Sequence, residues 1–318
     1  MQKALFLINP VSGQHAGTLL KEQIDAYLQE LPDRSRYDTA FTDVNVGQQM
    51  KELSSRYETL VVAGGDGTLS EVVQGLRSLG YAPKIGLIPL GTGNDLAGSL
   101  GISACLKKKG LPALLDVIIT GKTFALDSIS INRQRLFTNY FGLGNDAKTA
   151  MLFSSLRSRP GYQALCSSPL RKAVYCLLAL TSGGYRIPFD LEFAYRTPDG
   201  SPGIKRIPAG AHGLIISNAK TYAGGMQFSS LCCMNDRLFE VTVITGTLQR
   251  IMMPAALLSA RPLNRCCPGL LQFQTDSLQI ALRGETFYQI DGEAGAALPR
   301  EMQTLDINID EPIDMIVP

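Results

Sequence analysis

One stretch, residues 60 to 68, constrains the fold of this chain more than any other. It reads Leu-Val-Val-Ala-Gly-Gly-Asp-Gly-Thr, and an amphipathic pattern follows it, made by Leu69, Val72, Val73 and Leu76. A short apolar run that ends in glycines before a helix is typical of a buried strand of a parallel sheet. The glycines let a phosphate approach backbone N–H groups, and the helix N-terminus that follows favours an anion.

Asp66 is unexpected in such a loop, because phosphate oxygens repel a carboxylate. It fits if it holds Mg²⁺, directly or through water, or if it accepts a proton from an attacking hydroxyl. The alternative, which this motif alone leaves open, is a strand-to-helix turn in which Asp66 is only a cap.

Two further junctions have the same character. Residues 85 to 95 read Ile-Gly-Leu-Ile-Pro-Leu-Gly-Thr-Gly-Asn-Asp, and residues 5 to 13 read Leu-Phe-Leu-Ile-Asn-Pro-Val-Ser-Gly. In open parallel sheets, ligands bind beyond the carboxyl ends of the strands. We therefore expect the three loops to form one shared site.

The patterning predicts two domains. Up to about residue 124 the pattern alternates between strands and helices, which indicates an α/β domain with a parallel sheet. We expect its strands near 3–8, 36–42, 59–63 and 85–88, and its helices near 17–30, 46–56, 69–79, 94–100 and 111–120. From Phe124 onward short alternating runs predict a mostly antiparallel second domain, a β-sandwich, and Leu305, Ile307 and Ile309 predict one last strand.

The ordered set of motifs resembles the diacylglycerol kinase catalytic family, in particular bacterial lipid kinases related to sphingosine and ceramide kinases. The matching residues are Asn9-Pro10-x-Ser12-Gly13, Gly64 to Val72, Gly91-Thr92-x-Asn94-Asp95, Leu126-Asp127, Asn139 to Ala147 and Asp291-Gly292-Glu293. The Gly-Gly-Asp-Gly-Thr piece alone is less specific, since NAD kinases and 6-phosphofructokinases carry something similar. The resemblance implies that 1–124 with about 302–318 form an α/β ATP-binding catalytic domain, and that 125–301 form a β-sandwich lipid and metal domain.

The resemblance also implies roles for individual residues. Asp66, Asp95 and Asp127 would form an acidic network around catalytic Mg²⁺, and Glu293 would be the base that takes the proton from the lipid hydroxyl. A carboxylate crowded by others has a raised pKa, which suits a base. ATP would contact Asn9, Pro10, Val11, Ser12, Gly13, Thr42, Gly65, Asp66, Gly67, Thr68, Leu69, Ser70, Glu71 and Thr92.

A second, structural Mg²⁺ is implied by the segment from Cys233 to Leu238. In the family this segment reads roughly Asp-Gly-x-Leu, and its aspartate and backbone carbonyls bind the ion, which here would give Asp236, Leu238 and Cys233. Arg237 stands where the family has glycine. Other departures include Ser70 for asparagine and Met226 in a Gly-Gly-Gly segment, and they concern the identity of the lipid more than the reaction.

The composition limits the classes of molecule that the protein is expected to bind. A net charge of +2 gives no nucleic-acid signature. The seven cysteines include no Cys-x-x-Cys and favour a reducing cytosol over a disulfide framework. No apolar run approaches the roughly 20 residues that span a bilayer, and the most apolar helix pattern, Ala173 to Leu180, is buried or faces lipid chains. We expect a cytoplasmic protein with peripheral membrane association, a lipid alcohol at the membrane surface as substrate, and no nucleic acid; a homodimer stays open.

Three functions compete on the sequence. The first is an ATP-dependent lipid kinase that transfers the γ-phosphoryl group to diacylglycerol or a similar lipid alcohol and uses Mg²⁺. The second is a soluble-substrate kinase of the NAD kinase type, which the Asn9 opening and the Glu293 ending disfavour. The third is a nucleotide- or lipid-binding protein without turnover, for which Ser70 and Arg237 leave room.

Overall fold

The chain forms two compact units. A computed structural model describes residues 3–53, 56–90, 94–157, 159, 168–181, 184–222, 227, 229–230, 232–259, 262–267, 269–295 and 304–318. The first unit comprises Met1–Leu126 with Glu311–Pro318, and the second comprises Asp127–Asp310. The chain therefore crosses between the units twice.

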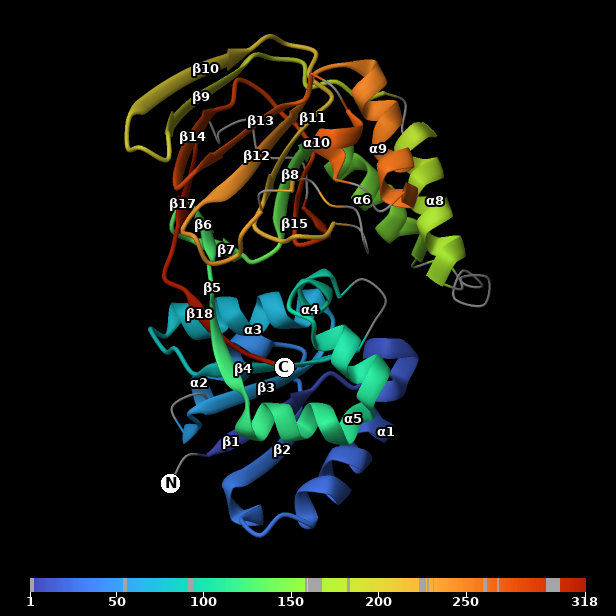
Figure 1. The fold of residues 1–318 in the computed structure, drawn as a ribbon, viewed down its shortest axis with the longest axis vertical. Coiled ribbons are helices and arrows are strands. Elements are labelled where there is room, and N and C mark those ends of the chain that lie inside the picture. Colours follow the sequence, from blue (N-terminus) through green and yellow to red (C-terminus); the bar gives the residue numbers. More distant parts are fainter. Residues whose placement is uncertain are drawn as a thin grey trace. The chain divides into compact units, whose positions relative to one another are not determined.

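The first unit is built on a six-stranded sheet in the order β2-β1-β3-β4-β18-β5. All neighbouring strands are parallel except β5, which runs antiparallel to β18. The strands are β1 Ala4–Ile8, β2 Tyr37–Phe41, β3 Thr59–Gly64, β4 Lys84–Pro89, β5 Lys122–Leu126 and β18 Ile313–Val317. The helices that flank it are α1 Ser12–Gln29, α2 Val46–Leu53, α3 Asp66–Ser78, α4 Asp95–Ser99 and α5 Ile102–Thr120 (Figure 1).

Burial explains why these segments are strands. β1, β3 and β4 are apolar along nearly their whole length and almost wholly buried, as expected for the centre of a parallel sheet covered by helices. β2 lies at the edge and is only half-buried. The predicted helix at 111–120 is the second part of α5, which bends at Gly110, where φ is 85°.

The second unit contains two six-stranded sheets. One has the order β10-β9-β14-β17-β6-β7 and the other β13-β12-β11-β8-β15-β16, and every pairing in both is antiparallel. The strands are β6 Ile129–Ile131, β7 Arg135–Phe137, β8 Tyr140–Gly144, β9 Leu191–Arg196, β10 Pro202–Ile207, β11 Gly213–Ser217, β12 Phe239–Ile244, β13 Leu271–Thr275, β14 Ser277–Ala281, β15 Tyr288–Ile290, β16 Glu293–Gly295 and β17 Thr304–Ile309.

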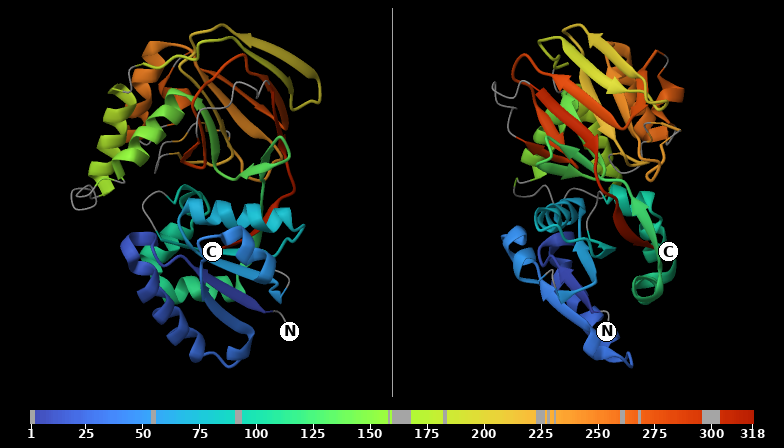
Figure 2. Two further views of the ribbon diagram at one scale, coloured as in Figure 1. Left: turned by 180° about the vertical axis from the view of Figure 1, so that it is seen from behind. Right: turned by 90° about the vertical axis from the view of Figure 1, so that its left-hand side faces the viewer.

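One apolar core joins the two sheets. Phe137 and Phe193 from the first sheet and Phe141, Phe239 and Val241 from the second are all at most 1% exposed and belong to one contact cluster. The predicted β-sandwich is therefore confirmed. Helices cover one side of it, as Figure 2 shows: α6 Asn145–Arg157, α8 Ser168–Thr181, α9 Thr247–Ser259 and α10 Leu263–Cys266.

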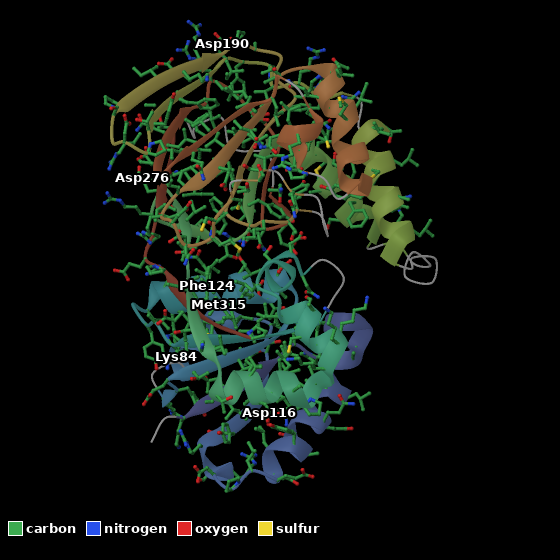
Figure 3. All side chains as sticks on the ribbon, viewed as in Figure 1. Lys84, Asp116, Phe124, Asp190, Asp276 and Met315 are labelled. Carbon is green, nitrogen blue, oxygen red and sulfur yellow. The ribbon has the colours of Figure 1, made fainter. Side chains whose placement is uncertain are left out.

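The C-terminal boundary differs from the prediction. The alternating residues Leu305 and Ile307 lie in β17, which pairs with β14 and β6 in the second unit. The chain returns to the first unit only at Glu311, later than the predicted residue 302. A further strand, β18, then enters the first sheet, where Met315 lies beside Phe124 and Ile85 (Figure 3).

Within the described residues, no helix combines the length and the apolar character that a membrane span requires.

Candidate active site

The loop after β1 is held against helix α3 by Asn9. The Asn9 side-chain amide donates to Thr68 Oγ1 (2.9 Å), and its Oδ1 accepts the N–H of Val11 (3.0 Å). The backbone N–H of Asn9 donates to the Ala63 carbonyl at the end of β3 (2.9 Å). Asn9 thus ties two of the predicted ligand loops together, at the carboxyl ends of adjacent strands.

A hydrogen bond joins Asp66 and Asp95 at the same edge. The backbone N–H of Asp95, which opens α4, donates to Asp66 Oδ2 (2.9 Å), and Asp66 itself opens α3. Asp95 is 3% exposed and Asp66 is half-buried. Carboxylate oxygens are ligands that Mg²⁺ prefers, so both side chains are candidates for a magnesium ion, although no three such side chains gather as a metal-binding group among the described residues.

The backbone approaches closely around this edge. A Cβ on Gly17 of α1 would lie 2.2 Å from the Asn9 carbonyl oxygen, and a Cβ on Gly64 would lie 2.7 Å from the Thr68 Cβ. Glycine is therefore required at both positions, because any side chain would push α1 or α3 away from the loops. The first turn of α3 adds N–H groups that the helix itself does not use, a favourable setting for phosphate.

The other predicted ATP contacts lie around the same loops. Ser12 and Gly13 begin α1, the N–H of Thr42 pairs with the Ile8 carbonyl (2.8 Å), and Gly65 precedes α3. Leu69 is different, since its side chain is 1% exposed in the core and only its backbone is available to a ligand. Thr92 lies outside the described residues. The remaining members of the predicted set are Pro10, Val11, Gly67, Ser70 and Glu71, all of which fall on the β1–α1 loop or the first turns of α3.

The predicted base Glu293 belongs to the second unit, where it begins β16 and is exposed. The turn before it is fixed by Asp291, whose carboxylate accepts the N–H groups of Thr138 (3.2 Å), Asn139 (2.9 Å) and Tyr140 (3.1 Å). Asp291 has φ of 49° and Gly292 of 86°, a left-handed pair that reverses the chain. In the Asp-Gly-Glu motif the aspartate is therefore a positioning residue, which the sequence did not reveal.

Asp127 is the first residue of the second unit and is 1% exposed. Its Oδ2 accepts the backbone N–H of Arg237 (2.7 Å), and its Oδ1 lies 3.3 Å from the guanidinium Nη1 of the same residue. The structure therefore brings Asp66 and Asp95 together within the first unit, and it pairs Asp127 with an arginine within the second.

The segment predicted to bind a structural metal includes an arginine. Asp236 Oδ1 accepts the Leu238 N–H (3.1 Å), Cys233 Sγ lies 3.2 Å from Asn235 Oδ1, and the guanidinium of Arg237 lies beside the carboxylate of Asp127. Among the described residues no three His, Cys, Asp or Glu side chains gather as a metal-binding group. The expected ligands also include backbone carbonyls, so the structural Mg²⁺ at Asp236, Leu238 and Cys233 stays a prediction.

The second unit also contains a mostly apolar pocket of about 500 Å³, counted with the solvent at its mouth. It lies between the covering helices and the second sheet, and its walls include Cys176, Ala179, Ile244 and Met253. Polar groups converge on it from Asn145, Asp146, Thr149, Tyr175, His212, Tyr222 and Arg250. Apolar walls with a few convergent polar groups are typical of a small-molecule site.

Asp146 is the buried acid of this pocket. Tyr222 OH donates to Asp146 Oδ1, Gln289 Nε2 donates to Oδ2 (2.8 Å), and Tyr175 OH lies 3.0 Å from Tyr222 OH. Burial raises the pKa of the Asp146 carboxyl, and the two hydrogen bonds oppose that shift. Asp146 lies inside the motif from Asn139 to Ala147, yet sequence reasoning gave it no role; the signal was a carboxylate two residues after the strand-like run 140–144.

Comparison with known proteins identifies a family for both units. The family model of the diacylglycerol kinase catalytic domain matches residues 3–131, and that of the diacylglycerol kinase accessory domain matches residues 136–294. The chain belongs to the diacylglycerol kinase family. It is therefore a kinase. The catalytic-domain model covers most of the first unit of this diacylglycerol kinase family member, and the accessory-domain model covers most of the second.

Individual relatives match all or most of the chain. A diacylglycerol kinase of Bacillus subtilis (strain 168) is 24% identical, with all of this chain and 97% of the relative covered. Diacylglycerol kinase 2 of Arabidopsis thaliana is 26% identical over 91% of this chain and 44% of the plant protein. The crystal structure of a diacylglycerol kinase from Bacillus anthracis str. Sterne has a TM-score of 0.67 at 19% identity, with 100% and 97% of the two chains covered. At this identity the structural similarity to the Bacillus anthracis protein shows the fold alone.

Proposed function

We propose that this kinase transfers the γ-phosphoryl group of ATP to the hydroxyl of diacylglycerol or a similar lipid alcohol, with Mg²⁺ as the metal. The proposal rests on the edge of the first sheet. There Asn9 joins two loops, glycines let the helices lie close to these loops, and the Asp95 N–H donates to the Asp66 carboxylate. The named relatives are diacylglycerol kinases, which supports the lipid acceptor.

On the nucleotide side, the loops and the first turn of α3 would bind the phosphates through backbone N–H groups. Asp66 and Asp95 would hold Mg²⁺, which would neutralise negative charge on the transferred group. The role of Asp127 in this network stays a prediction. ATP specificity, rather than use of another nucleotide, is part of the proposal.

On the acceptor side, the apolar pocket beside Asp146 suits part of a lipid better than it suits a sugar phosphate. Its polar lining could hold a hydroxyl or ester, while Cys176, Ile244 and Met253 contact apolar chain. Exposed leucines on α8 (Leu170, Leu177 and Leu180) and the exposed Leu248 and Ile251 on α9 add apolar surface on the same helices. This surface supports the proposed peripheral association with a membrane.

Glu293 would take the proton from the lipid hydroxyl as the oxygen attacks phosphorus. Its backbone is set by the Asp291 carboxylate and by the Gly292 N–H, which donates to Gln289 Oε1 (2.8 Å). A base on a rigid turn keeps its distance to a bound hydroxyl, which general-base catalysis requires.

In the deciding experiment, the purified protein is incubated with labelled ATP, Mg²⁺ and a panel of lipid alcohols in mixed micelles. NAD is included as the competing soluble acceptor. Label should enter the lipid phase, and diacylglycerol or a close analogue should be the best acceptor. Phosphorylation of NAD without label in any lipid would refute the proposal, and binding of ATP and lipid without transfer to either would favour a binding protein.

The same assay tests Asp66. Asp66→Asn should abolish most turnover, because the amide loses the negative charge that would hold Mg²⁺ while its oxygen can still accept the Asp95 N–H. Asp33→Asn, at an exposed carboxylate that pairs with Arg36 in the same unit, is the matched control and should retain activity. Unfolding temperatures of both variants should equal that of the wild type within about 2 °C.

A further inference from the structure

Arg237 adopts a backbone conformation that usually selects glycine. Its φ is 63°, in the left-handed region that L residues adopt at an energetic cost. An arginine that persists there is offset by contacts that glycine could not make. We therefore expect the contacts of the Arg237 side chain to stabilise the second unit.

The guanidinium lies where the chain enters and leaves the second unit. Asp127 is the first residue of that unit and Asp310 is the last. Nη1 of Arg237 lies 3.3 Å from Asp127 Oδ1 and donates to the Asp310 carbonyl oxygen at 2.6 Å. The Arg237 N–H adds a third bond, to Asp127 Oδ2 at 2.7 Å.

Burial makes this pair different from an ordinary surface ion pair. The Asp127 side chain is 2% exposed, whereas that of Arg237 is 53% exposed. A nearly buried carboxylate requires a positive partner, because an unpaired buried charge is strongly destabilising. Both side-chain contacts are made by the single nitrogen Nη1, which bonds an acid and a carbonyl at once.

We propose that Arg237 is a built-in cation that replaces the structural Mg²⁺ expected at this segment and clamps the two crossing segments of the second unit together. The positive charge needed beside Asp127 is covalently part of the chain, so a divalent ion is superfluous there. This inference is independent of the acceptor lipid.

The first test uses the wild-type chain and Asp236→Asn without nucleotide. Unfolding temperatures are measured in EDTA and over a range of Mg²⁺ concentrations. Asparagine keeps an oxygen for the Leu238 N–H and removes the charge that a metal at this segment needs. We expect the same Mg²⁺ response from both proteins. A Mg²⁺-dependent rise in the wild type that Asp236→Asn removes would overturn the proposal.

The second test removes the guanidinium in EDTA. Arg237→Gln keeps a side chain and the strained backbone but no charge, and it should unfold about 4–8 °C below the wild type. The matched control is Arg196→Gln, because Arg196 pairs with Asp276 at 3.5 Å in the same unit with both side chains substantially exposed. That control should shift by less than about 2 °C.

An unfolding temperature for Arg237→Gln within the range of the Arg196 control would overturn the clamp. If Arg237→Gln does not fold, Arg237→Lys replaces it, since lysine keeps a charge but not the geometry of the guanidinium. The lysine variant should unfold below both the wild type and the Arg196→Gln control in EDTA, and an unfolding temperature equal to that of the wild type would overturn the proposed role of the guanidinium.

Discussion

At the scale of single residues, the site depends on carboxylates that are held in different ways. The carboxylate of Asp66 is held by the backbone N–H of Asp95, that of Asp291 by three N–H groups, and that of Asp127 by an arginine. Each arrangement satisfies a charge that would otherwise be costly near or below the surface. Glu293 is the exception, because it is exposed and its placement comes from the turn before it.

Glu293→Gln should lower kcat by about 10²–10⁴ with little change in KM for the lipid, because it removes a base and keeps the shape of the side chain. Steady-state rates on the best lipid acceptor, at saturating ATP, provide the measurement. Glu285→Gln, at another exposed glutamate of the same unit, is the control. Unchanged turnover of the Glu293 variant would remove the assigned role.

Glu240 should give the fold a distinct pH dependence. Burial raises the pKa of its carboxyl from 4.5 to about 7, and hydrogen bonds from Cys232 and Gln274 only partly oppose this. Since the folded state holds the proton more tightly, the free energy of unfolding should fall as the pH rises from about 4.5 to about 7.

Glu240→Gln mimics the protonated acid and should remove that fall. We expect the variant to match the wild type near pH 4 and to be roughly 1–3 kcal/mol more stable near pH 8. Urea unfolding at several pH values measures this difference, with the half-exposed Glu192→Gln as control. A constant difference across the range would mean that Glu240 ionises normally.

At the scale of elements, α1 can lie against the β1 loop only because Gly17 has no side chain. Gly17→Ala would place a Cβ 2.2 Å from the Asn9 carbonyl oxygen. We expect a loss of about 1–3 kcal/mol in the free energy of unfolding and a raised KM for ATP, since Asn9 positions the nucleotide loops.

Gly47→Ala is the control for that helix substitution. Its nearest neighbour to an added Cβ is Asn45 Oδ1 at 3.6 Å, an ordinary contact, and it lies within α2. Alanine should raise the free energy of unfolding by up to about 1 kcal/mol there. Equal effects of the two substitutions on KM would contradict the proposed reason for Gly17.

The sequence was informative about elements wherever periodicity and glycine position agreed. The strands ending at Ile8, Gly64 and Pro89 were predicted within one residue and the helices after the last two within three, because apolar runs and Gly-rich turns are local signals. The helix after Ile8 begins at Ser12, five residues before its predicted start. The β17 boundary was not, since the alternation at 305–309 is the same whichever sheet receives the strand. Partners distant in sequence, such as Arg237 with Asp310 or Asp146 with Tyr222, have no local signal at all.

At the scale of the whole molecule, the first unit depends on a strand from the far end of the chain. Met315 of β18 is fully buried between β4 and β5. Met315→Asp should cost more than about 4 kcal/mol, because it buries an unpaired charge. Calorimetry should show the unfolding transition of the first unit lowered and that of the second unchanged.

Asp314→Asn, an exposed position in the same strand, should leave both transitions in place. A single transition that shifts as a whole in the Met315 variant would contradict the assignment of separate cores to the two units.

The position of β18 has a consequence for biosynthesis. A chain emerging from the ribosome presents β1 to β4 early, but the strand that lies between β4 and β5 appears only after the whole second unit. The sandwich, encoded wholly between the two crossings, can complete its pairing first. Until β18 emerges, the nascent first unit exposes the edges of β4 and β5, so this unit completes its sheet after the sandwich although most of it is translated before.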